Sequence, residues 1–210
     1  IDGAEKIQRS ELDGTQVENL ISGLISPIGI ALDTDAGKMY LLDPRARKIQ
    51  RANLDGSDVE DLVTGVGIDP RDLPPGVDNI EGRIALDVSG GKMYWTDLEG
   101  RKISRADLDG SNEEDLVTGD KYTGIALDVS EGKMYYGTFI PNPPLRRANL
   151  DGSDVEENLV PNANPTDIAL DMSAGKIYWT VWGGAEVRGK ILRANLDGTD
   201  VQTVVDGGAQ

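Results

Sequence analysis

The side chains best suited to bind a ligand lie where a repeating pattern of the chain is interrupted. Three segments break that pattern, at 65–83, 139–144 and 181–189. They are rich in charged and amide groups, and Trp182 stands beside two glycines outside any repeat position. Exposed aromatic rings stack on sugars and anchor protein interfaces. With two residues from shorter connections, the predicted ligand-binding set is Arg45, Arg71, Asp72, Asp78, Asn79, Tyr122, Asn142, Trp182, Glu186 and Arg188.

The usual catalytic side chains are missing. The chain contains no histidine and no cysteine. A Ser–His–Asp triad, a histidine-based zinc site, a thiolate metal site and disulfides are therefore excluded. An all-oxygen Ca²⁺ site, held by carboxylate and amide groups, remains open as an alternative. We therefore assign no catalytic residue and expect no cofactor other than Ca²⁺.

The chain is strongly acidic. Its 37 aspartates and glutamates outnumber 21 lysines and arginines, and the formal net charge is −16. Such a surface repels phosphate backbones and anionic membranes, so we expect no nucleic-acid partner. No run of 18 apolar residues is present, so we expect no insertion into a membrane.

Two phrases recur along the chain and must supply the scaffold. A phrase ending in Leu-Asp-Gly-Ser or Leu-Asp-Gly-Thr occurs five times, and Ile-Ala-Leu-Asp followed by a short turn and Gly-Lys occurs four times. Repetition of this kind means that one supersecondary unit has been copied. The first phrase lies at 6–15, 48–57, 102–111, 145–153 and 191–199, and the second begins at 30, 84, 125 and 168.

Each unit is predicted to form four short antiparallel strands. The apolar period is two rather than 3.6, and each Asp-Gly pair is typical of a hairpin turn. Four strands in about 40–50 residues make one blade of a β-propeller. We therefore predict an all-β β-propeller of four-stranded antiparallel blades, with four complete units plus an N-terminal half unit. It should fill 1–210 as a single domain.

One tetrad makes a family resemblance specific. Tyr94-Trp95-Thr96-Asp97 reads YWTD, and Tyr178-Trp179-Thr180 is a near copy. With the two phrases, the chain resembles the YWTD repeats of the low-density lipoprotein receptor class B family. The resemblance implies a six-bladed propeller, extracellular or secreted, that binds other molecules and is not an enzyme. Because six units need about 250 residues, we expect a five-bladed or truncated six-bladed ring, and a homodimer that completes the propeller is a further alternative.

Charged residues also repeat. The arginine of each third strand should be paired with a carboxylate within or between blades, because an unpaired buried charge is very costly. The aspartate of Ile-Ala-Leu-Asp should cap a turn, the alternative being a ring of carboxylates that holds Ca²⁺. The aspartate of Leu-Asp-Gly should belong to a hairpin turn.

Insertions are confined to one end of the predicted blades, which is typical of a binding face in repeat proteins. We therefore predict a non-enzymatic recognition module for a protein or peptide. The alternatives are a carbohydrate-binding lectin, in which Trp182 or Tyr122 stacks on a sugar, and a Ca²⁺-dependent lactonase or lyase.

Overall fold

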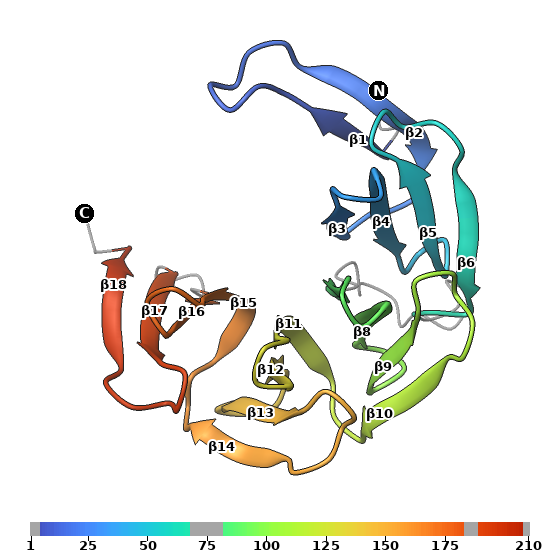
Figure 1. Ribbon diagram of the computed structural model, residues 1–210. Helices are drawn as coiled ribbons and strands as arrows, with labels where there is room; N and C mark the ends of the chain where they lie inside the picture. The colour runs from blue at the N-terminus through green and yellow to red at the C-terminus, as the bar shows by residue number, and fades with distance from the viewer. Residues whose placement is uncertain (1–4, 68–81, 183–188, 208–210) are drawn as a thin grey trace. The chain divides into compact units, whose positions relative to one another are not determined.

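The computed structural model describes residues 5–67, 82–182 and 189–207, and these form strands and turns without a helix. Strands follow one another in sequence order across each sheet (Figure 1). The first sheet has two strands, β1 (Glu5–Arg9) and β2 (Glu18–Leu24). The second contains β3 (Gly29–Asp33), β4 (Lys38–Asp43), β5 (Lys48–Asn53) and β6 (Glu60–Thr64). The third contains β7 (Ile84–Asp87), β8 (Lys92–Asp97), β9 (Lys102–Asp107) and β10 (Glu114–Thr118).

Two further four-stranded sheets complete the described chain. One contains β11 (Tyr122–Asp128), β12 (Lys133–Thr138), β13 (Leu145–Asn149) and β14 (Glu156–Val160). The other contains β15 (Pro165–Asp171), β16 (Lys176–Val181), β17 (Lys190–Asn195) and β18 (Gln202–Asp206). Four complete units and an N-terminal half unit are therefore confirmed. Among the described residues, no helix is long and apolar enough to cross a membrane.

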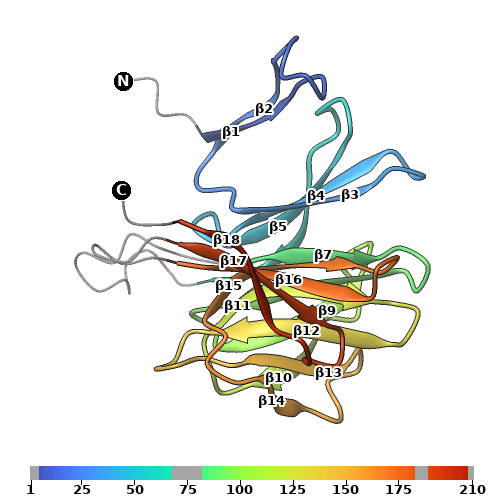
Figure 2. The same ribbon diagram turned by 90° about the vertical axis from the view of Figure 1, so that its left-hand side faces the viewer.

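The chain forms two compact units. Unit 1 comprises Ile1–Tyr94 and Ala106–Glu113, and unit 2 comprises Trp95–Arg105 and Glu114–Gln210. In unit 2 the strands β12, β13 and β14 are antiparallel neighbours in one sheet and run across the lower half of the side view (Figure 2). Their sheet packs on the sheet of β15–β18, and the apolar positions of both sheets meet at that contact.

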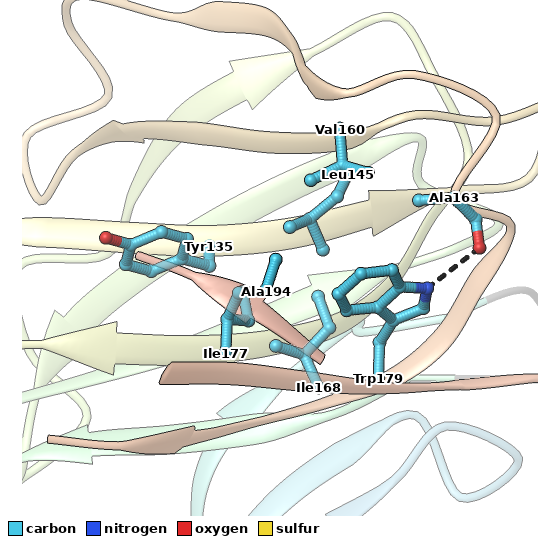
Figure 3. Close-up of a cluster of buried hydrophobic side chains, with 8 residues drawn as sticks. All are labelled: Tyr135, Leu145, Val160, Ala163, Ile168, Ile177, Trp179 and Ala194. Atoms are coloured by element: carbon cyan, nitrogen blue, oxygen red, sulfur yellow. Dashed lines mark hydrogen bonds between the residues drawn. The ribbon is translucent and has the colours of Figure 1, made fainter. Parts of the chain in front are cut away.

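The core of unit 2 is made by side chains from these two sheets (Figure 3). Trp179 is its largest member, and its indole N–H donates to the carbonyl of Ala163 at 2.9 Å. Burial of a tryptophan normally requires such an acceptor for its polar edge. The cluster consists of Tyr135, Leu145, Val160, Ala163, Ile168, Ile177, Trp179 and Ala194.

The aspartates of Ile-Ala-Leu-Asp cap turns, as predicted. Oδ1 of Asp33 accepts the backbone N–H of Ala36 at 2.9 Å, and Oδ1 of Asp128 accepts that of Glu131 at 3.0 Å. A glycine then closes each turn with positive φ, which is 68° at Gly37. These carboxylates are therefore occupied by their own turns.

The predicted arginine–carboxylate pairs are present at Arg9, Arg51, Arg105 and Arg147, whereas Arg193 donates to the amide oxygen of Gln202 instead. Nη2 of Arg51 lies 2.7 Å from Oε1 of Glu60, and Arg147 and Glu156 are separated by the same distance. Nη1 of Arg147 reaches further and donates to the carbonyl of Leu196, which belongs to the Leu-Asp-Gly turn of the next sheet. The four arginines with a glutamate partner all make this bond, so each ties one blade to the next as well as its own two outer strands.

The Leu-Asp-Gly turns are held by their aspartates. Asp151 accepts the hydroxyl of Ser153 at 2.6 Å and its backbone N–H at 2.9 Å. The hydrogen bond from the hydroxyl, which has the larger effect, and the one from the backbone N–H together hold the pKa of Asp151 below its ordinary value. The same causes lower the pKa of Asp13, Asp55, Asp109 and Asp197.

Acid should therefore destabilise the fold. A carboxyl group whose pKa is lower in the folded state stabilises the fold above its unfolded pKa, near 4. This contribution disappears as the pH falls through the folded pKa. We expect thermal unfolding temperatures that are constant from pH 7 to about pH 5 and decrease towards pH 3. A variant with Asp55→Asn and Asp151→Asn should show a smaller decrease, and an equal decrease would contradict this origin.

Candidate functional site

The candidate site is the end of unit 2 at which the variable connections emerge, which we call the loop edge. It comprises 98–101, 119–121, 139–144, 161–164 and Trp182. Backbone hydrogen bonds join neighbouring connections, since the N–H of Phe139 donates to Lys121 at 2.7 Å and that of Asn164 donates to Pro143 at 2.8 Å. The loops therefore form one continuous edge.

Two exposed aromatic side chains stand on this edge. Phe139 is 64% exposed and Trp182 is 67% exposed. Each is the first residue after the second strand of its sheet, β12 and β16 respectively. Large aromatic groups this accessible are suited to a partner's surface. Trp182 was predicted, whereas Phe139 was missed, although it occupies the same repeat position and is the only phenylalanine in the chain.

Ion pairs fix the charged groups of the edge. Nη1 of Arg146 lies 2.8 Å from Asp120, and its Nε lies 2.8 Å from Glu157. The guanidinium is largely buried, with Arg146 only 8% exposed. Lys121 pairs with Glu99 at 3.0 Å. Two cations thus pair with three carboxylates, which leaves a net charge of −1 and holds the polar groups around the exposed aromatic side chains in place.

Tyr122 does not provide the exposed ring expected for sugar stacking. It is 1% exposed, and its ring meets that of Tyr136 edge to face, with centroids 5.7 Å apart. Burial raises the pKa of both phenols. The strand β11 directs this side chain into the protein interior, which explains why an aromatic residue near a loop is covered.

The other predicted residues are dispersed. Asn142 is exposed on the loop edge with φ 54°, a conformation that asparagine tolerates. Arg45 is half-buried in the turn after β4, in unit 1. The remaining six lie outside the described residues, namely Arg71, Asp72, Asp78, Asn79, Glu186 and Arg188. The structure thus places Asn142 and Trp182 on one edge.

In unit 1, the aspartate at the fourth position of the YWTD-like tetrad holds two neighbouring connections together. Asp43 is fully buried and accepts three backbone N–H groups, from Ile25 at 2.9 Å and from Ser26 and Ala46 at 3.0 Å. It thereby joins the connection before β3 to the turn after β4. The sequence signal for this role is the last letter of YWTD, which holds an aspartate at 43 and 97.

Among residues 5–67, 82–182 and 189–207, no group of three or more aspartates and glutamates is placed to hold a metal ion.

Comparison with known proteins confirms the resemblance drawn from the tetrad. Residues 91–129 match the low-density lipoprotein receptor repeat class B family. Low-density lipoprotein receptor-related protein 5 from Homo sapiens is 36% identical over 125 residues, and that from Mus musculus is 32% identical over the same length. These stretches cover 59% of this chain but only 6% of each receptor.

Solved structures share the fold. A chain in the crystal structure of a nidogen/laminin complex superposes with a TM-score of 0.78 at 21% identity, over 96% of this chain and 75% of that one. A gluconolactonase from Xanthomonas campestris superposes with a TM-score of 0.69 at 18% identity, over 96% and 68%. At these identities the likeness establishes the fold alone.

Proposed function

We propose that this chain, a β-propeller module of class B (YWTD) repeats, is a non-enzymatic recognition module that binds a protein or peptide through the loop edge of unit 2. The observation that carries the proposal is the exposure of Phe139 and Trp182 at the same repeat position of adjacent sheets. Aromatic side chains of this kind contribute most of the affinity in many protein interfaces.

The surroundings of the two rings favour a protein partner. Binding to a rigid surface costs less conformational entropy than binding to a mobile one. The loop edge is held by backbone hydrogen bonds between its connections and by the buried guanidinium of Arg146 between Asp120 and Glu157. Apolar anchors within a polar rim are the usual anatomy of a protein interface.

The relatives support the same class of function. One is named as a receptor-related protein, and another match comes from a nidogen/laminin complex. Because the matched stretch is 6% of each receptor, the receptors' activities do not transfer directly. An extracellular or secreted location is part of the proposal and rests on the family resemblance.

A lectin is the second candidate, and the exposed indole of Trp182 favours it because indoles stack on sugar rings. The covered ring of Tyr122 removes one of the two stacking surfaces that the sequence suggested. A Ca²⁺-dependent lactonase or lyase has less support, since the likeness to a gluconolactonase is one of fold and no histidine is present.

Peptide display separates these possibilities. A random twelve-residue peptide library is selected on the wild-type chain, and the enriched peptides are titrated against a variant with Phe139→Ser and Trp182→Ser. Loss of two anchors should weaken binding at least tenfold, because each hot-spot truncation costs about 2 kcal/mol or more. A glycan array at micromolar protein concentration is measured in parallel and should remain silent.

The matched control is a variant with Val129→Ser and Met172→Ser. These side chains are also exposed and apolar, but they lie in the turns that follow β11 and β15, at the other ends of those strands. The control should bind the peptides like the wild type. Peptides that bind all three proteins equally would refute the loop edge as the site. Glycan binding by the wild type that is lost in the variant with Phe139→Ser and Trp182→Ser would establish the lectin instead.

A further inference from the structure

One cation of the loop edge has only a neutral partner among the residues that the structure describes. Arg101 is exposed in the turn after β8, and its Nε and Nη2 both donate to the carbonyl oxygen of Gly119, the first at 2.9 Å. The other cations of this edge, Lys121 and Arg146, are each paired with carboxylates. Arg101 therefore offers a positive charge that no described carboxylate neutralises.

The guanidinium of Arg101 is held in one orientation by its own turn. The backbone has φ 55°, and its carbonyl accepts the N–H of Gly119 at 2.9 Å. Because Nε and Nη2 share one acceptor, the side of the guanidinium that they form faces the protein. Nη1 and the second hydrogen of Nη2 form another edge, which donates to no described residue. Such a fork matches the two oxygens of a carboxylate.

The charge of the loop edge differs from that of the whole chain. Residues 98–101, 119–121, 139–144 and 161–164 contain two acidic and two basic residues, whereas the chain has a formal net charge of −16. Charges more than about 8 Å away are largely screened at physiological ionic strength. The loop edge can therefore accept an acidic group although the protein as a whole is acidic.

Arg101 lies next to one of the two exposed aromatic side chains. The connection 119–121 accepts the bonds of Arg101 at Gly119, and its Lys121 carbonyl accepts the N–H of Phe139 at 2.7 Å. The connection 161–164 is bonded to 139–144 in turn, and it leads to Pro165, which pairs with Val181 beside Trp182. The contacts along the edge thus run from Arg101 to Phe139 and then to Trp182.

We propose that the protein or peptide bound at the loop edge carries an aspartate or glutamate that pairs with Arg101, beside the apolar side chain that contacts Phe139. This inference rests on the proposed function, because it specifies the chemistry of the partner at the same surface. A partner that covers Phe139 also removes water from the neighbouring guanidinium, and a desolvated charge without a counter-charge is costly. A carboxylate in the partner supplies that counter-charge.

Synthetic peptides test the pairing. Peptides selected on the wild-type chain are made with acetylated and amidated termini, so that only side chains supply carboxylates, and each acidic residue is replaced in turn by its amide. Replacement of the pairing residue should weaken binding to the wild type about fivefold, since an exposed ion pair contributes up to about 1 kcal/mol. The same replacement should have no effect on binding to Arg101→Gln, which should itself bind the acidic peptide about fivefold more weakly.

Charge reversal separates direct pairing from a structural role of Arg101. Arg101→Glu should bind the peptide with lysine at the pairing position more tightly than the acidic peptide, which is the reverse of the wild-type preference. The matched control is Arg47→Gln, at the same repeat position in unit 1. Arg47 has φ 58°, and its Nη2 donates to the carbonyl of Gly65 at 3.4 Å. This control should bind every peptide like the wild type, and circular dichroism melts check that all variants are folded.

The outcomes distinguish this inference from the proposed function. Peptides that require Phe139 and Trp182 but bind Arg101→Gln as tightly as the wild type would overturn the carboxylate pairing and leave the recognition site intact. Absence of acidic residues from the selected peptides, or a lysine peptide that does not recover binding to Arg101→Glu, would also overturn it. A selection that yields no peptide dependent on the two aromatic side chains would overturn both proposals.

Discussion

Gly152→Ala is expected to lower the free energy of unfolding by about 3–4 kcal/mol. Two costs combine at this position. Its φ of 83° places an L-residue in the left-handed region, which costs about 1–2 kcal/mol. The new Cβ would also stand 2.6 Å from the carbonyl oxygen of Leu116, and relief of such overpacking costs a further 1–3 kcal/mol or so. Backbone atoms form this contact, so no side chain can rotate away.

Gly14→Ala is the matched control. Its φ of 81° is almost the same, but nothing lies within 4 Å of the added Cβ. We therefore expect only the conformational cost of about 1–2 kcal/mol. Urea unfolding followed by circular dichroism measures both free energies. Equal losses in the two variants would show that the close approach of Gly152 to Leu116 contributes nothing to stability.

The fold was predictable because its signals are local and repeated. Alternation of apolar residues, Asp-Gly turns and capping aspartates recur in every unit, and each specifies a strand or turn within a few residues. The pairing of Arg51 with Glu60 also follows from the sequence, since the hairpin between them fixes their register. The hydrogen bond from Arg51 to the carbonyl of Leu108 joins residues far apart in the chain, and no local sequence pattern predicts this contact.

The candidate site was less predictable. An aromatic residue at the edge of a strand can face either solvent or the core, and the choice depends on neighbouring strands. Trp182 is exposed, whereas Tyr122 is covered by contacts that include Tyr136. Periodicity within β11 does not reveal this difference, because β11 has buried side chains on consecutive positions at its start. Six predicted residues lie outside the described chain, so their placement stays a prediction.

Asp43→Ala is the second change with a large expected effect, a loss of about 3–5 kcal/mol in the free energy of unfolding. The carboxylate is fully buried and accepts three backbone N–H groups. Alanine would leave these partly buried donors without a protein acceptor, and a fully buried unsatisfied donor costs about 1–3 kcal/mol. Partial rescue by water entering the space left by the carboxylate keeps the expected loss below the full sum.

Asp61→Ala provides the control in the same unit. Asp61 pairs with Lys48 at 2.6 Å, but both side chains are more than one-third exposed, and an exposed pair contributes at most about 1 kcal/mol. Asp43→Asn should fall between the two, because its amide keeps one acceptor oxygen and places an NH₂ group where the second accepted an N–H. If urea unfolding gave Asp43→Ala and Asp61→Ala the same free energy of unfolding, the hydrogen bonds of Asp43 to the connection before β3 and to the turn after β4 would not contribute to stability as proposed.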